Sequence, residues 1–403
     1  MEASSMIHPK PGNVVLMIGT MKGAFLLCAA GPRKRWQVSG PHLPGHVVYS
    51  AAYDSRDGRH RIWFSSNNWA FGTTLRASDD FGKTWSNPES YPIKFPEDTG
   101  QALKNIWQIA LGSDTEPDTL YCGVEPAALF ESRDAGHSWY LMRGLFNHPH
   151  REKWNPGNGG LCLHTVLPDP SNPKRIHVAI SAGGVYRTDD RGANWQARSQ
   201  GIRADFQPVK YPEFGQCVHK IVRHPSRPER LFLQNHGGLY RSDDAGDTWK
   251  DIAHGVPSDF GFPIVMNPHD PDTAYVLPLE AEMRCVPEGK LRVYRTRNGG
   301  GSWDSLTRGL PQRNAYETVL RDALANDTLD PAGLYFGTRS GKLYGSATNG
   351  SAWELILEGL PPIVCVKTGI AKEISGARRL IPVRKATNKV KTKRSSSSRR
   401  KAA

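Results

Sequence analysis

A short motif ending in tryptophan recurs about every fifty residues, and this repeat constrains the fold more than any other feature of the sequence. Its consensus is S/T-x-D-x-G-x-T/S-W, and a degenerate seventh copy ends at Trp36. The other six copies are SDDFGKTW (78–85), SRDAGHSW (132–139), TDDRGANW (188–195), SDDAGDTW (242–249), TRNGGGSW (296–303) and SATNGSAW (346–353). Successive tryptophans are 49 to 56 residues apart, which leaves room for four short strands in each unit.

Each unit between two motifs reads as an apolar strand, a polar turn, a second apolar strand, a turn of small residues and a third strand. The strand that carries the motif tryptophan completes a four-stranded blade. The sequence therefore predicts an all-β protein, a seven-bladed β-propeller with one motif hairpin in each blade. Forty glycines and thirty prolines are typical of many short strands joined by tight turns. We expect an N-terminal extension at residues 1–13 and the propeller at residues 14–369.

The two ends of the propeller indicate how its ring closes. The first unit lacks a preceding inner strand, whereas the segment PIVCVKTG around Cys365 has no unit of its own. We predict that Ile363–Thr368 is the innermost strand of the first blade. A C-terminal strand in blade one would close the ring and leave no exposed sheet edge there.

The polar residues of the motif have structural roles in this interpretation. Ser, Thr and Asp side chains bond nearby backbone groups in tight turns, and glycine adopts the positive φ that such turns need. The tryptophan covers apolar surface beside the turn. We therefore do not expect the motif aspartates to act as general acids; they are Asp80, Asp134, Asp190 and Asp244.

The net charge of +13 is concentrated near the end of the chain. Residues 376–403 hold eleven Lys or Arg and no acid, so the rest of the chain carries about +2. We expect a disordered basic tail at residues 370–403, with a weak contact to nucleic acid or another anionic surface as the alternative role. Six dispersed cysteines without CxxC spacing, and no long apolar run, lead us to expect a cytoplasmic monomer that does not contact a membrane.

The motifs resemble the BNR or Asp-box repeats of sialidase-like propellers, a group commonly labelled glycosyl hydrolase. The stretches GVEPAALFESRDAG, GLCLHTVLPDP, GQCVHKIVRHP and QNHGGLYRSDDAG carry this resemblance. It implies a propeller with Asp-box hairpins. In enzymatic sialidases, three arginines hold the substrate carboxylate, a tyrosine with a glutamate partner is the nucleophile, and an acid donates a proton. This sequence lacks the early Arg-Ile-Pro motif, its repeats indicate no arginine triad, and adjacent Tyr316 and Glu317 would face opposite sides of a strand.

If the Asp-box hairpins lie on one face, the first strands begin on the opposite face, around the central channel. Alignment of the units places Trp107, His164, His219 and Phe262 at one position on the first strands. It places Asn67, Glu125, Ser181, His236 and Glu280 at a second position, where the second strands end, with Asn235 as a neighbour. We predict five catalytic residues, namely Glu125, His164, His219, His236 and Glu280.

Two kinds of chemistry are open to these five residues. They could bind a divalent metal ion such as Zn, Mn, Fe or Ca, or they could serve as acid and base without a metal. A structural alternative is that each histidine is hydrogen-bonded inside a packed blade. The substrate-binding residues that we expect from the same face and its long loops are Trp107, Asn235, His148, His150, Arg151, Asp205 and Asp259.

Two functions of different classes fit this prediction. The first is a hydrolase or lyase that acts on a glycan or a small polar molecule at a channel mouth lined by His and Glu. The second is a non-enzymatic scaffold that recognises a protein or peptide on the same face.

Overall fold

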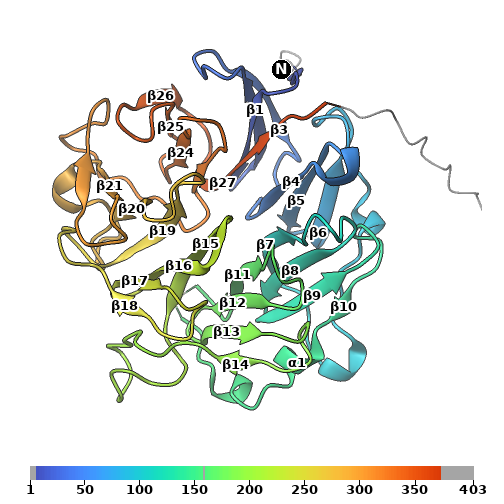
Figure 1. The fold of residues 1–403 in the computed structure, drawn as a ribbon. Helices are drawn as coiled ribbons and strands as arrows, with labels where there is room; N and C mark the ends of the chain where they lie inside the picture. Colours follow the sequence, from blue (N-terminus) through green and yellow to red (C-terminus); the bar gives the residue numbers. More distant parts are fainter. Residues whose placement is uncertain (1–5, 158, 374–403) are drawn as a thin grey trace, which may run out of the picture.

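The computed structural model describes residues 6–157 and 159–373 and confirms the seven-bladed propeller (Figure 1). Seven antiparallel sheets surround a central axis, and we number them as blades one to seven. Blade one contains β27 (Ile363–Ile370), β1 (Val14–Thr20), β2 (Gly23–Ala29) and β3 (Gln37–His42). Blade two contains β4 (Ala51–Asp54), β5 (Arg61–Asn68) and β6 (Gly72–Ser78). Blade three contains β7 (Asn105–Leu111), β8 (Leu120–Glu125), β9 (Ala128–Ser132) and β10 (Tyr140–Leu141).

The remaining four blades each follow the chain order from the inner to the outer strand. Blade four contains β11 (Leu163–Pro168), β12 (Ile176–Ile180), β13 (Gly184–Thr188) and β14 (Gln196–Ala197). Blade five contains β15 (Val218–His224), β16 (Arg227–Asn235), β17 (Leu239–Ser242) and β18 (Lys250–Asp251). Blade six contains β19 (Gly261–Met266), β20 (Ala274–Pro278), β21 (Val293–Thr296) and β22 (Asp304–Leu306). Blade seven contains β23 (Leu324–Asn326), β24 (Leu334–Gly337), β25 (Leu343–Ser346) and β26 (Glu354–Leu357).

Within residues 6–157 and 159–373, helical structure is confined to short connections between strands. They are η1 (Arg56–Gly58), η2 (Pro88–Ser90), η3 (Glu97–Thr99), α1 (Arg143–Phe146), η4 (Arg151–Lys153) and η5 (Pro287–Gly289). Among the described residues, no helix is long and apolar enough to cross a bilayer.

The predicted closing strand is confirmed and is two residues longer than expected. β27 pairs antiparallel with β1 through register partners such as Met17 and Lys367, and these two strands lie side by side in Figure 1. Ile7 and Ala371 are buried in the apolar cluster that joins blades one and two. Residues just outside the predicted propeller boundaries thus pack onto blade one, while most of the predicted basic tail lies outside the described residues.

Blade two differs from the predicted four strands, because its sheet contains only β4, β5 and β6 among the described residues. After the motif tryptophan, the Ser86 N–H donates one bond to the Ala77 carbonyl at 2.9 Å. The chain then enters η2 at Pro88, which has no N–H to donate. The fourth strand is therefore not continued.

The motif hairpins have the structural role expected of them, as the one in blade four illustrates. Thr188 donates its hydroxyl to an Asp190 oxygen at 2.7 Å, and the Asn194 N–H donates to the same oxygen at 2.9 Å. The Gly192 N–H donates to the Thr188 hydroxyl at 2.8 Å. Both Arg191 and Gly192 have positive φ, so the turn contains two left-handed residues in succession. The Asp190 carboxylate is therefore occupied by its own turn.

Candidate binding site at the mouth of the central channel

A cavity of about 730 Å³ lies at the end of the molecule where the inner strands begin. Third strands run parallel to inner strands within a blade, so the motif hairpins that follow them lie at the opposite end. Every blade contributes to the cavity wall. The lining residues, in chain order, are Tyr49, Trp107, Asn155, Pro156, Gly157, Gly159, Ser181, Ala182, Phe206, Gln207, Cys217, His219, His236, Phe262, Arg284, Leu320, Arg321, Asp322, Arg339 and Val364.

The four residues that the sequence aligned on the first strands share one structural feature. The pairing of the first two strands shifts register at or around each of them, in four consecutive blades. A β-bulge adds a residue to one strand and redirects its side chain. These residues are Trp107, His164, His219 and Phe262.

His164 and His219 both reach from this bulge to the next blade, but the second nitrogen of each ring has a different partner. His164 Nε2 lies 2.8 Å from the Val218 carbonyl, and its Nδ1 lies 3.1 Å from the Thr165 hydroxyl. Its ring is fully buried and is not part of the cavity wall. Burial and the charge of Arg321 hold the His164 pKa well below its usual value. The structure thus gives His164 the packed environment of the structural alternative.

At the second aligned position, blades four and five agree with the alignment, whereas blade six is shifted by one residue. The Ser181 N–H donates to Cys162 and the His236 N–H donates to Cys217, each at 2.9 Å. In blade six the corresponding bond comes from Leu279, whose N–H donates to the Phe260 carbonyl at 2.8 Å. Leu279 therefore occupies the position that the alignment assigned to Glu280, and a one-residue shift places Glu280 in the following turn.

Glu125 ends β8 and lies beside the cavity rather than in its wall. The Trp107 indole N–H donates to Glu125 Oε2 at 3.0 Å, and the Trp107 ring lines the cavity. Trp107 also contacts Tyr49, with ring centroids 4.9 Å apart. The carboxylate is thus oriented by an aromatic residue of the wall.

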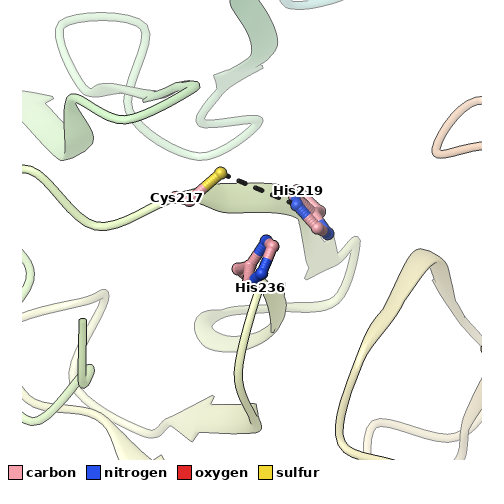
Figure 2. Close-up of side chains that lie close together, drawn as sticks. All are labelled: Cys217, His219 and His236. Carbon is pink, nitrogen blue, oxygen red and sulfur yellow. Dashed lines mark hydrogen bonds between the residues drawn. The ribbon is translucent and has the colours of Figure 1, made fainter. Parts of the chain in front are cut away.

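Cys217, His219 and His236 form a compact group in the wall, all from blade five (Figure 2). One ligand atom from each lies within 4.8 Å of the others. Burial lowers the pKa of both histidines, with Arg321 adding to the effect at His219 and Arg284 at His236. Both rings are therefore neutral near pH 7. Of the five predicted catalytic residues, the structure brings only His219 and His236 together in the cavity.

Three arginines converge on the same cavity from blades six and seven. Arg284 lies over the ring of Phe262, with its guanidinium 5.7 Å from the centroid, and Arg321 lies 5.5 Å from the Trp107 centroid. Arg339 follows β24 and is exposed. None of the three makes an ion pair with a carboxylate among residues 6–157 and 159–373. A cavity lined by unpaired guanidinium groups favours an anionic ligand.

Asp322, the carboxylate in the cavity wall, belongs to a buried ion cluster. Lys220 Nζ and Lys367 Nζ lie 2.7 Å and 2.6 Å from Asp322 Oδ1. Although burial raises its pKa, the two ammonium charges hold the Asp322 pKa far below its usual value. It therefore stays ionised and is unsuited to donate a proton.

The predicted loop residues lie outside the cavity wall. His150 Nδ1 lies 3.1 Å from the Tyr186 hydroxyl, and the His150 ring stacks on Phe214. The His148 ring packs edge-on against the His150 ring. Arg151 donates to the Ala127 carbonyl and covers the Phe146 ring.

The remaining predicted substrate-binding residues, two from loops and Asn235 at the end of β16, share one partner, Arg203. Asp205 accepts a bond from its guanidinium at 2.9 Å, and Asp259 forms a second ion pair with it. Asn235 donates to the Arg203 carbonyl at 3.0 Å. Of the seven predicted substrate-binding residues, Trp107 alone lines the cavity.

Comparison with known proteins links this fold to glycoside hydrolases. A probable oligoxyloglucan-reducing end-specific xyloglucanase from Neosartorya fischeri is 27% identical over 211 residues, covering 49% of this chain and 23% of that protein. Xyloglucanase Xgh74A from Acetivibrio thermocellus is 25% identical over 236 residues, covering 53% of this chain and 26% of that protein. This chain thus spans about a quarter of the length of these curated relatives.

Among solved structures, an ancestral GH74 enzyme has a TM-score of 0.52 at 16% identity. The match covers 77% of this chain and 38% of that one, and it shows a shared fold. No family model matches the chain. The protein is a seven-bladed β-propeller with similarity to xyloglucanases, and its resemblance to sialidase-like repeat proteins stays a prediction.

The predicted site omitted both Cys217 and the arginines, although the sequence holds a signal for the cysteine. Cys217 stands two residues before His219, a spacing that places both side chains on one side of a strand. Arg284 and Arg339 follow the second strands of blades six and seven, in connections of different length, whereas Arg321 precedes the first strand of blade seven. Their convergence depends on ring geometry, so the sequence alone carries no signal for it.

Proposed function

We propose that the protein is a carbohydrate-active propeller of the hydrolase type that takes an anionic saccharide into the mouth of its central channel. The observation that carries this proposal is the convergence of Arg284, Arg321 and Arg339 on a cavity with aromatic walls. Arginine pairs with carboxylate or sulfate oxygens in a planar, two-bond geometry, and aromatic rings offer flat apolar surface to a ligand. The similarity to xyloglucanases supports the carbohydrate and hydrolase parts of the proposal.

Glu125 is the residue to which we assign proton transfer. Its carboxylate is held by the Trp107 indole at the edge of the cavity, within reach of a ligand that packs on that ring. Asp322 lies in the cavity wall itself but is engaged by two lysines. Glu125→Gln keeps an acceptor for Trp107 while removing the ionisable group.

Titration calorimetry with an oligosaccharide that carries uronic acids, and with its neutral counterpart, tests the binding step. We expect the acidic ligand to bind more tightly, and Arg321→Gln to weaken its binding by about tenfold or more, since a bond to a charged group contributes about 1.5–3 kcal/mol. Arg297→Gln is the control, because Arg297 is an exposed residue of the Asp-box hairpin in blade six. Equal affinity for acidic and neutral ligands would contradict the proposal.

Product analysis tests the catalytic step separately. Wild-type protein should release new reducing ends from the acidic oligosaccharide, and Glu125→Gln should bind it without cleaving it. Undiminished cleavage by this variant would remove Glu125 from the mechanism.

A second candidate function, a scaffold for a protein or peptide, is favoured by the rim of the same face. Large apolar side chains are exposed on four different loops around the mouth, including Trp69 at 96% and Phe71 at 70%. The full rim consists of Trp69, Phe71, Phe206, Val209, Tyr211, Met283 and Tyr316. Exposed apolar groups gathered on one face are typical of contact surfaces.

A peptide array probed with wild-type protein and with the double variant Trp69→Ala, Phe71→Ala tests the scaffold. Defined peptides should bind the wild type and lose binding to the variant, while saccharide binding stays unchanged. Peptide binding that does not respond to the rim substitutions would count against this function.

A further inference from the structure

The register of one hairpin in blade five brings three metal-binding side chains together (Figure 2). Cys217 directly precedes β15, and His219 stands two residues after Cys217, so both side chains face the cavity. His236 directly follows β16, and its N–H donates to the Cys217 carbonyl at 2.9 Å. This backbone bond fixes Cys217 and His236 as neighbours across the hairpin.

The spacing of the ligand atoms suits a small tetrahedral ion. Cys217 Sγ lies 3.7 Å from His219 Nε2. A tetrahedral zinc ion with Zn–S near 2.3 Å and Zn–N near 2.0 Å holds its sulfur and nitrogen ligands about 3.5 Å apart. The third ligand atom, from His236, lies within 4.8 Å of the other two, so metal binding would draw its ring towards them.

His219 is already oriented as a metal ligand. Its Nδ1 lies 2.6 Å from the Gly261 carbonyl, which can only accept a hydrogen bond, so Nδ1 carries the proton. The lone pair of Nε2 therefore points towards Cys217. A histidine that binds a metal through one nitrogen and donates from the other to a carbonyl is the usual outer-shell arrangement.

We propose that Cys217, His219 and His236 bind a zinc ion whose fourth coordination position opens into the cavity. One thiolate and two imidazoles are ligands that zinc accepts, whereas calcium and magnesium prefer oxygen. All three residues line the cavity, so water or an anionic oxygen of a ligand can take the open position. Sites with three protein ligands and one open position are the catalytic rather than the closed structural type of zinc site.

Blade four provides a comparison within the same chain. Cys162 and His164 occupy the positions of Cys217 and His219, but Ser181 stands where blade five has His236. His164 turns its Nε2 to the next blade, and Arg321 donates to Cys162 at 3.6 Å. Blade four therefore lacks both the third ligand and the orientation of the second, and the zinc site belongs to blade five alone.

Metal analysis of protein purified without a histidine tag tests the proposal. After zinc loading and removal of excess metal, the wild type should retain about one equivalent, in line with a single site. Replacement by cobalt should give the intense visible bands of a tetrahedral ion and a thiolate charge-transfer band in the near ultraviolet. Zinc should also protect Cys217 from a thiol reagent, and a chelator should reverse this protection.

Variants distinguish this site from other thiols and imidazoles. Cys217→Ser should lose the charge-transfer band, and His236→Gln should lose stoichiometric zinc. Cys285→Ser and His150→Gln are the matched controls, because both residues lie outside the cavity wall, and they should retain full occupancy. Circular dichroism spectra and melting curves verify that each variant is folded.

Two results would overturn the proposal: a folded wild type that retains no more zinc than Cys217→Ser, or a cobalt spectrum of an octahedral ion without a thiolate band. Either would leave a Cys217 thiol that simply donates to His219. The zinc site stands independently of saccharide binding, since Arg321→Gln should retain the metal while losing the anionic ligand. Failure of one proposal is thus separable from failure of the other.

Discussion

The first-strand histidines of blades four and five connect neighbouring blades through backbone carbonyls. His164 reaches Val218 at 2.8 Å, and His219 reaches Gly261 at 2.6 Å. In each ring the bonded nitrogen must carry the proton, which leaves the other nitrogen as an acceptor. His164 turns that acceptor to the Thr165 hydroxyl, whereas His219 turns it to the Cys217 thiol. Two histidines at one structural position therefore have different chemistry, because different ring nitrogens face the next blade.

The aspartates of the repeated motif give a prediction at the same scale. Asp190→Ala should lower the free energy of unfolding by about 1 kcal/mol, because an exposed acceptor of turn hydrogen bonds is lost and water partly replaces it. Asp190→Asn should cost less, since Asn298 makes the equivalent bond to the Ser302 N–H at 2.9 Å in blade six. Urea denaturation at pH 7 measures both variants. Equal losses for Ala and Asn would contradict the hydrogen-bond explanation.

Acid titration of stability gives a further measure of this carboxylate. The Asn194 backbone N–H and side-chain amide lower the Asp190 pKa in the folded state. A lowered folded pKa stabilises the fold above the unfolded value near 4, and this contribution is lost as the pH falls. The Asn variant should therefore show a slightly flatter decline in stability below pH 4 than the wild type.

At the scale of strands and blades, the repeat predicted most of what the structure shows. Six copies of the motif, its degenerate seventh copy ending at Trp36 and an unpaired apolar segment near Cys365 were sufficient for the blade number and the closing strand. The missing strand of blade two was not predicted, because Trp85 matches the motif and the break depends on Pro88 after it. Glu280 was misplaced by one residue, since Leu279 bonds the Phe260 carbonyl as His236 bonds the Cys217 carbonyl, and the next turn begins at Glu280. The sequence thus predicted where a residue lies along a strand, but it could not predict the direction of a side chain at a β-bulge.

The closing strand β27 gives the prediction at this scale. Ile363 is fully buried, whereas Ile370 at the other end of the strand is only partly buried. Ile363→Ala should lower the free energy of unfolding by about 2–4 kcal/mol, because it leaves a cavity between blades one and seven. Ile370→Ala should cost clearly less. Denaturation midpoints that shift equally for the two variants would show that burial along β27 does not determine its contribution.

For the molecule as a whole, the buried ion cluster joins blades that are far apart in the sequence. Lys220 belongs to blade five, Asp322 precedes the first strand of blade seven, and Lys367 belongs to the closing strand of blade one. One carboxylate thus neutralises part of two positive charges beside the channel axis. Three blades are connected there by charge, and a parallel β-bridge between Asp322 and Cys365 adds a backbone connection between blades seven and one.

Asp322→Asn should destabilise the protein by about 3–5 kcal/mol, because it leaves two buried ammonium groups without their counter-ion. The double variant Asp322→Asn, Lys367→Met should recover part of this loss, since one of the like charges is then absent. Because the lysines lower the Asp322 pKa in the folded state, its stabilising contribution is present above about pH 4 and is lost in stronger acid. Thermal denaturation from pH 3 to 7 measures both effects. No recovery in the double variant would contradict the charge explanation.

The pairing of β1 with β27 also determines the order in which the ring can be completed during synthesis. β1 leaves the ribosome early, yet its inner edge has no partner until Ile363–Ile370 has been made, more than 340 residues later. At about 5–20 residues per second, this wait is on the order of twenty to seventy seconds. Blade one is therefore the first blade begun and the last one finished. During that interval an apolar strand edge is open to other chains, and the protein depends on whatever shields nascent strands in its cell.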